Sequence, residues 1–86
     1  MANSFHLIIV TPEKRFFEGE VISIIAPASK GYLGVLVNHA PLLTTLNPGK
    51  LTIKEGGGKE EIVFIGKGFL DIFKNRAIIL TELVKE

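Results

Sequence analysis

The sequence predicts an all-β domain, built either as a sandwich or as a barrel. Three observations carry this prediction: short β-rich runs recur at close spacing, turn residues separate them, and no stretch keeps the 3.6-residue period of a long helix. The chain has 86 residues, of which 47% are hydrophobic, and this content excludes a disordered chain. We therefore expect one compact domain over residues 1–86, without a linker or an internal repeat.

The first half of the chain contains three β-rich runs. Residues 5–10 form the first run, which ends at Thr11-Pro12 because proline has no N–H to give to a strand ladder. Residues 20–26 form the second run, which ends at Pro27 for the same reason. Residues 33–37 form the third run.

Turn signals divide the second half into further strands. Asn47-Pro48-Gly49-Lys50 has proline and glycine at the positions that a type II turn requires, and Gly56-Gly57-Gly58 predicts a flexible hairpin turn. Two short segments are helix-like but too short to be stable alone, residues 41–46 and the last six residues. The strands expected between these signals are residues 50–55, 61–65, 69–73 and 77–83.

Two of these strands are apolar on both faces. Ile62 and Phe64 alternate with Val63 and Ile65, and residues 78–80 are apolar throughout. In a two-layer sandwich, one face of each sheet meets water. Two explanations remain open: the curved sheets of a small domain bury parts of both faces, or an outer face docks on a partner.

Composition excludes several classes of function. The absence of cysteine excludes disulfides, thiolate metal sites and a cysteine nucleophile. The formal net charge is +1 and the basic residues are scattered, so no nucleic-acid surface is expected. No segment approaches the ~20 apolar residues of a membrane span, and the N-terminus does not resemble a signal peptide. Any membrane contact is therefore expected to pass through another protein.

Two glycine-containing segments begin like nucleotide-binding motifs without completing them. Residues 66–71 start like a dinucleotide fingerprint, but the third glycine is missing and a strand follows instead of a helix. Gly49-Lys50 lacks the earlier glycine and the following Ser or Thr of a P-loop. We expect a β-turn or bulge at residues 66–68, and no cofactor or small-molecule substrate.

The two histidines do not indicate a catalytic or metal site. His6 lies in an apolar strand and is expected to be structural. His39 could act as a base only beside a nucleophile and a carboxylate, and residues 21–54 contain no acidic residue. Two histidines without cysteine also make a poor metal site.

Acidic pairs are the remaining candidates for acid–base chemistry. Glu18 and Glu20 could converge because residues two apart on a strand share a face, but they flank Gly19 in an expected turn and are predicted to be solvated. Glu60 and Glu61 are expected to keep a hairpin polar. The sequence therefore predicts no catalytic residue, no metal ligand and no independent enzyme.

Several motifs, taken in order along essentially the whole chain, resemble one family. Their order and spacing resemble the N-terminal β-sandwich domain of the epsilon subunit of rotary ATP synthase, which is called delta in mitochondria. The motifs that carry the resemblance are Phe5-His6-Leu7, Thr11-Pro12, Phe17-Glu18-Gly19-Glu20-Val21, Gly31-Tyr32-Leu33-Gly34-Val35-Leu36, His39-Ala40-Pro41-Leu42-Leu43, Pro48-Gly49, and Phe64-Ile65-Gly66-Lys67-Gly68-Phe69-Leu70.

The resemblance implies a fold and a role. The fold is a flattened β-sandwich of short, mostly antiparallel strands. The role is that of a non-catalytic central-stalk subunit, which links the gamma subunit to the membrane c ring so that proton flow is coupled to ATP synthesis. The implied location is the cytoplasmic face of the bacterial plasma membrane, as a peripheral part of the complex.

The resemblance also assigns two partner-facing segments. The loop that would face the c ring consists of Ser29, Lys30, Gly31 and Tyr32. The segment that would lie near the gamma subunit consists of Asn38, His39, Ala40, Pro41 and Leu42.

The chain departs from the family pattern at two positions and in length. Tyr32 stands where many members carry an acidic residue, and an aromatic anchor can replace such a contact. Asn38 stands where other members have glycine, and asparagine tolerates the left-handed backbone conformation. The helical hairpin that usually follows this domain is absent from these 86 residues. A naturally short form is expected, and a truncated chain is the alternative.

A second class of function remains open beside the stalk role. The chain could be a generic β-sandwich module for protein interaction or ligand binding, with a coincidental resemblance. An independent hydrolase is disfavoured because no nucleophile and base can be paired.

Overall fold

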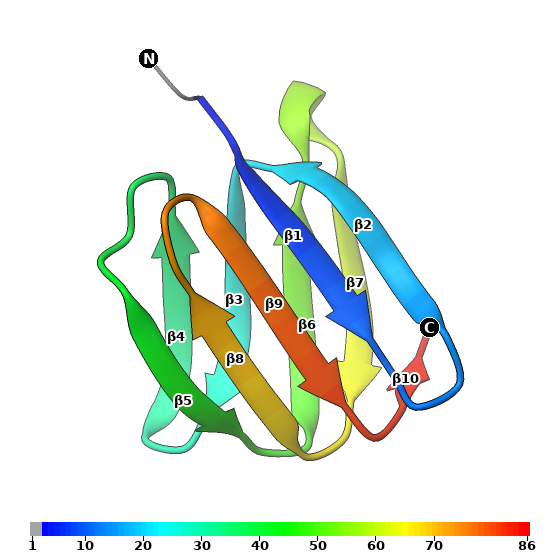
Figure 1. Ribbon diagram of the computed structural model, residues 1–86. Coiled ribbons are helices and arrows are strands. Elements are labelled where there is room, and N and C mark those ends of the chain that lie inside the picture. The colour runs from blue at the N-terminus through cyan, green and yellow to red at the C-terminus, as the bar shows by residue number, and fades with distance from the viewer. Residues whose placement is uncertain (1–2) are drawn as a thin grey trace.

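The computed structural model describes residues 3–86 and contains ten strands and one short 3₁₀ turn (Figure 1). All strands are short, as the turn signals predict. Their bounds are β1 Phe5–Val10, β2 Arg15–Val21, β3 Ser23–Ala28, β4 Gly31–Leu36, β5 Leu42–Leu46, β6 Gly49–Lys54, β7 Glu60–Ile65, β8 Gly68–Ile72, β9 Arg76–Thr81 and β10 Val84–Lys85, with the turn η1 at Gly56–Gly58 between β6 and β7.

The strands form one strongly curved sheet whose two halves face each other (Figure 1). The strand order is β10-β7-β6-β3-β5-β8-β9-β1-β2, and β4 pairs with β3 outside this path. The front half holds β5, β8, β9, β1 and β2, and the rear half holds β4, β3, β6, β7 and β10. Every pairing is antiparallel except that of β1 with β9. The predicted all-β, mostly antiparallel fold is therefore confirmed.

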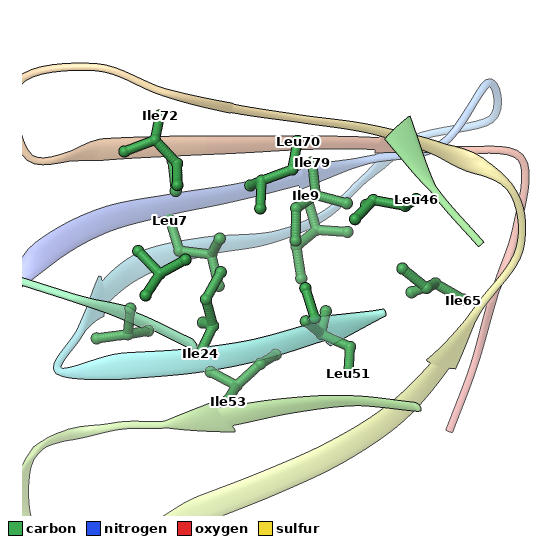
Figure 2. Packing of buried hydrophobic residues seen from close by; sticks show 14 of the residues in the cluster. Leu7, Ile9, Ile24, Leu46, Leu51, Ile53, Ile65, Leu70, Ile72 and Ile79 are labelled. Carbon is green, nitrogen blue, oxygen red and sulfur yellow. The ribbon is translucent and has the colours of Figure 1, made fainter. Parts of the chain in front are cut away.

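The core lies between the two halves and is entirely aliphatic at its centre (Figure 2). It follows from strand alternation, because every second residue of a strand points to the same face. In β1, for example, Leu7 and Ile9 are buried while His6 and Ile8 are only partly covered. The largest fully buried side chains are Leu7, Ile9, Ile24, Leu51, Ile53, Leu70, Ile79, Val21, Val35 and Val63.

Both helix-like segments are strands, so these two expectations are wrong. Residues 42–46 form β5 and pair with β8 along their whole length. Leu42, Thr44 and Leu46 are the more buried residues of this strand, which is the alternation of a strand and not of a helix turn. In the last six residues, Val84–Lys85 pairs with β7. Tertiary pairing decides the conformation of both segments, since neither is long enough to form a helix alone.

The expected turn around Gly19 is also a strand. Gly19 lies within β2, opposite Leu7 of β1, and the strand begins at Arg15. The predicted run 20–26 is divided at Ile22 between β2 and β3. The two segments pair with different halves of the sheet, which the continuous apolar run does not reveal.

One of the two turns predicted from glycine is present in the structure and the other is not. Gly56–Gly58 links the β6–β7 hairpin as expected, with positive φ angles of 77° and 82° at Gly57 and Gly58. Gly49 does not form the predicted type II turn, because its φ is not positive and it is the first residue of β6. Its small size matters instead: a Cβ at Gly49 would lie 3.1 Å from Cβ of Pro27.

The outward apolar side chains are not buried by the curvature of the sheet. Ile62, Phe64 and Leu80 are 47%, 53% and 50% exposed, while Val63 and Ile79 between them are fully buried. The explanation that a small curved domain covers both faces is therefore wrong for these three residues. An apolar outer surface remains on both halves of the fold.

Gly68 provides a test of how tightly the front half is packed. A Cβ at Gly68 would collide with the carbonyl oxygen of Leu80 on β9, whereas a Cβ at Gly34 would meet nothing within 4 Å. We expect Gly68→Ala to lower the free energy of unfolding by about 1–3 kcal/mol, since backbone cannot yield as a flexible side chain does. Gly34→Ala is the matched control and is expected to change stability little. Thermal unfolding of both variants measures the difference, and equal melting temperatures would contradict this packing.

Candidate docking surface

The residues expected to face the c ring comprise the two-residue turn between β3 and β4 and the first two residues of β4. Together they are here called the 29–32 turn. Ser29 and Lys30 are exposed at its tip, and Gly31 has a φ of 119°, which favours glycine. The Ser29 N–H donates to the carbonyl of Thr45 at 3.1 Å, which ties the turn to the end of β5. The turn is therefore an exposed polar tip on a fixed base.

Tyr32 lies across the rear half and does not extend from the tip of the turn. The residue is 60% exposed, but a Cβ at Gly49 would lie 3.3 Å from its hydroxyl oxygen. Pro27 lies opposite Tyr32 in the β3–β4 ladder, and it is buried although it faces outward. The absence of a side chain at Gly49 thus allows the phenol to rest on the sheet, where it is held ready for contact.

The residues expected to lie near the gamma subunit form the connection from β4 to β5, here called the 38–42 loop. Asn38 has a φ of 65°, which confirms that asparagine adopts the left-handed conformation here. Its N–H donates to Oδ1 of Asn75 at 2.6 Å, and Nδ2 of Asn75 donates to Oδ1 of Asn38 at 2.9 Å. His39 Nδ1 donates to its neighbour's carbonyl, that of Ala40, at 2.7 Å. The loop is therefore fastened to the β8–β9 turn.

The fold places the two segments at opposite ends of β4 (Figure 1). A six-residue strand spans about 20 Å, so the 29–32 turn and Asn38 are well separated. Leu42 is the exception within its group. A groove of about 340 Å³ between β4 and β5 is lined by Ala28–Leu33 on one side and by Leu42, Leu43 and Thr44 on the other.

An apolar strip on the front half was not among the predicted site residues. Leu80 of β9 lies between Phe69 of β8 and Val10 of β1 in the strand register, and all three point outward. Phe69 and Leu80 are 52% and 50% exposed. The two-sided apolar pattern of residues 78–80 is the sequence signal for this strip, but it does not show which neighbours complete it.

His6 forms a charged cluster with the two carboxylates of the neighbouring strand. Nε2 of His6 is 2.9 Å from Glu18 Oε2, and Nδ1 is 2.9 Å from Glu20 Oε2. Arg15 donates to Glu18 at 2.6 Å and the Ser4 hydroxyl donates to Glu20 at 2.7 Å. Glu18 and Glu20 therefore share one face of β2, an arrangement that the sequence allows, whereas solvated side chains in a turn were expected. Their partnership with His6 was missed because this segment was expected to be a turn.

The cluster shifts the pKa of each member toward the charged form. Hydrogen bonds from Glu18 first and Glu20 second raise the pKa of His6 above its ordinary 6.5. The pKa of Glu18 is lowered chiefly by its hydrogen bond with His6 and then by that with Arg15. The pKa of Glu20 is lowered by Ser4 first and then by His6.

The described residues 3–86 contain no cluster of three or more His, Cys, Asp or Glu side chains that could hold a metal ion. In the same part of the chain, no helix is long and apolar enough to cross a membrane. One depression lies over the β8–β9 turn and is lined by Asp71, Phe73, Lys74, Arg76 and Ile78. It joins no histidine to a carboxylate.

The His6 cluster predicts a specific pH dependence of stability. The raised pKa of His6 gives stability that is full below pH 6.5 and is lost as the pH rises through the folded-state value. The lowered values of Glu18 and Glu20 give stability that is present above pH 4.5 and is lost on acidification. The contribution should therefore be largest between about pH 5 and 6.5. Thermal unfolding against pH, compared with His6→Gln, measures it. Parallel curves for both proteins would contradict the cluster.

The hydrogen bonds between Asn38 and Asn75 predict that a substitution at position 75 makes the 38–42 loop more mobile. Asn75→Gly keeps the positive φ of 57° accessible but removes both hydrogen bonds. We expect a loss of about 1 kcal/mol in stability and faster hydrogen exchange at Asn38 and His39. Asn75→Asp retains the acceptor for the Asn38 N–H and should give an intermediate effect. Unchanged exchange in Asn75→Gly would show that the pair does not hold the loop.

Comparisons with known proteins agree with the fold and with the resemblance. Residues 4–86 match the family model of the ATP synthase Delta/Epsilon chain, beta-sandwich domain. The chain is 40% identical over 82 residues to the ATP synthase epsilon chain of Dichelobacter nodosus, and 46% identical over 81 residues to that of Chlorobaculum tepidum. It superposes with a TM-score of 0.92, at 23% identity, on a chain of the Euglena gracilis mitochondrial ATP synthase, covering 98% of this chain and 54% of that one.

The relatives differ in how far they extend beyond the matched region. The alignment covers 95% of this chain but 57% of the Dichelobacter nodosus relative, and 62% of one from Desulfosudis oleivorans. It covers 94% of this chain and 92% of the Chlorobaculum tepidum relative. The family match over residues 4–86 takes in the whole β domain described above. The chain belongs to the ATP synthase delta/epsilon family, as a β-sandwich domain of the epsilon chain.

Proposed function

We propose that this chain is a non-catalytic subunit of the central stalk of a rotary ATP synthase. It links the gamma subunit to the c ring, so that proton flow through the ring is coupled to ATP synthesis. The family match over residues 4–86 carries the proposal. Membrane association then comes through the complex, with the subunit on the cytoplasmic face of the bacterial plasma membrane.

Two features of the fold support a mechanical role. The 29–32 turn and the 38–42 loop stand at the two ends of β4, and each is fastened to a second element by hydrogen bonds. The aliphatic core between them is closely packed and resists compression. A load applied at one end of β4 is therefore passed to the other end without large internal movement.

The chemistry of two exposed surfaces fits the proposed partners. Ser29 and Lys30 present a hydroxyl and a cation, which suit contact with polar loops of the c ring. Tyr32 adds an aromatic anchor with a hydroxyl at its edge. The front strip of Val10, Phe69 and Leu80 offers apolar area for a larger and more permanent interface with the gamma subunit.

The alternative function, a generic interaction module, is supported by one observation, the exposed apolar side chains. Docking within a stalk accounts for the same side chains. The stalk role is therefore the better-supported function.

A cysteine at position 32 tests the proposed orientation. The chain has no native cysteine, so Tyr32→Cys gives a single thiol, and Lys59→Cys is the matched control in the exposed β6–β7 connection. After reconstitution with the gamma subunit and the c ring, we expect Tyr32→Cys to cross-link to a cysteine in the polar loop of a c subunit. Lys59→Cys should not cross-link.

Two outcomes of this experiment would count against the proposal in different ways. A complex that assembles and couples normally, but gives equal cross-linking from both positions, would overturn the assignment of the 29–32 turn to the ring. Failure of the wild-type chain to bind the gamma subunit, at concentrations where a relative binds, would overturn the stalk role itself.

A further inference from the structure

We propose that one end of the domain binds directly to the surface of a membrane that contains anionic phospholipids. This end, here called the lysine end, consists of the connections 11–14, 29–30, 47–48, 66–67 and 82–83, together with the adjoining residues Arg15, Lys50, Lys85 and Glu86. The contact is weak and electrostatic. It does not depend on the stalk role.

The topology gathers at this end basic residues that are scattered along the sequence. Every pairing is antiparallel except that of β1 with β9, so the odd-numbered strands all run toward the lysine end and the even-numbered strands run away from it (Figure 1). The end therefore collects the five connections that follow β1, β3, β5, β7 and β9. Its basic residues are Lys14, Arg15, Lys30, Lys50, Lys67 and Lys85.

The charge of the domain is unevenly distributed as a result. The lysine end has six basic residues and three acidic ones, Glu13, Glu82 and Glu86. The remainder of the chain has four basic and six acidic residues. The formal charge is therefore +3 at the lysine end and −2 elsewhere, although the whole chain has a net charge of only +1.

The lysines of this end are available to an external anion. All five are exposed, and within residues 3–86 none of them forms an ion pair, because the ion pairs there join Glu18 to His6 and Arg15 and join Glu20 to His6. Glu82 is turned toward the chain, where its Oε2 accepts the N–H of Lys67 at 3.4 Å. Unpaired cations on neighbouring loops produce a positive potential in front of the end.

All five lysines lie close enough to the end to act together. Lys14, Lys30 and Lys67 lie in the connections themselves. Lys50 and Lys85 are the second residues of β6 and β10, so each is no more than about 7 Å along its strand. This distance is within the Debye length of about 8–10 Å at ordinary salt concentrations.

The arrangement of the lysines fits an extended anionic surface better than a single acidic peptide. They come from five separate parts of the chain and flank both halves of the fold, whereas a peptide reaches only residues along one line. Exposed apolar groups lie among them in the same connections: Pro12, Pro48 and Leu83, the last 45% exposed. Cations around apolar tips suit the boundary between lipid headgroups and acyl chains. We therefore assign the lysine end to a lipid surface.

The position of the lysine end is compatible with the stalk role. The 29–32 turn, which we propose to face the c ring, belongs to this end. The ring lies in the membrane, so the headgroups around it are on the same side of the domain. A direct lipid contact would then add to the association that comes through the complex.

Vesicles test the proposal with the wild-type chain. Binding is measured by co-sedimentation with vesicles made of equal parts of phosphatidylglycerol and phosphatidylcholine, and with vesicles of phosphatidylcholine alone. We expect binding to the anionic vesicles at low salt, at least tenfold weaker binding at about 0.5 M salt, and no binding to phosphatidylcholine alone.

Two double variants with the same change in charge locate the surface. Lys14→Gln with Lys67→Gln removes two charges from the lysine end, and Lys54→Gln with Lys59→Gln removes two from the opposite end. One lysine near an anionic membrane strengthens binding about fivefold, so the first variant should bind about 25-fold more weakly than wild type. The second should stay within about twofold of wild type. NMR signals of residues 29–30 and 66–67 should broaden with vesicles, and those of Gly56–Gly58 should not.

Four outcomes would overturn the proposal. One is the absence of binding to the anionic vesicles at low salt, and another is equal binding to phosphatidylcholine alone. The third is equal weakening by the two double variants. The fourth is binding of a polyglutamate peptide at the lysine end without binding of vesicles, which would assign the surface to an acidic protein. None of these results changes the test of the stalk role, which is binding to the gamma subunit.

Discussion

The two halves of the fold are held in register by a small junction at the end of β3. Ala28 pairs with Leu46 of β5, the Ser29 N–H donates to Thr45, and the Asn47 N–H donates to the carbonyl of Pro27. β3 also pairs with β4 and β6 of the rear half. Its bonds to the end of β5 therefore connect the rear half to the front half. The aliphatic core can form only if the halves face each other, so the core and the position of the 29–32 turn both depend on this junction.

The surface of this domain is organised differently from that of a free-standing β domain. Half-exposed apolar side chains lie on both outer faces, with Phe69 and Leu80 in front and Ile62 and Phe64 behind. They arise because β7 and β9 each contain four consecutive apolar residues, at 62–65 and 77–80, so outward positions are apolar as well as inward ones. Monomeric proteins rarely keep large contiguous apolar areas in contact with water. The same surface is expected when most of a subunit's outside is covered in an assembly.

The sequence predicts much of the fold because alternation and turn residues act locally. The hairpin at Gly56–Gly58 and the strands β1, β4 and β6–β9 follow from those signals. β5 was expected to be helix-like and Gly19 was expected to lie in a turn, because their strand conformation depends on partners far along the chain. Pairing across the sheet overrides weak local preference in both cases.

The sequence predicts less of the candidate site than of the fold, because the site depends on which strands are neighbours. The resemblance implied which two segments would face partners, but their placement at opposite ends of β4 depends on topology. The spacing of Glu18 and Glu20 allows them to share one face of a strand, whereas His6 joins them only because β1 and β2 are neighbours. The lysine end is likewise a property of the assembled sheet, since its basic residues are scattered along the sequence.

The parallel pairing of β1 with β9 has a consequence for how the protein is made. His6 lies opposite Arg76, so the first strand of the domain waits for nearly the last one before its inner edge is paired. Contacts between such distant parts of a chain form slowly because a long loop must first be closed. During synthesis, the edge of β1 that faces β9 therefore stays unpaired until residues 76–80 have been made. An unpaired strand edge with exposed apolar side chains favours aggregation, so the domain is most vulnerable in the interval before β9 is in place.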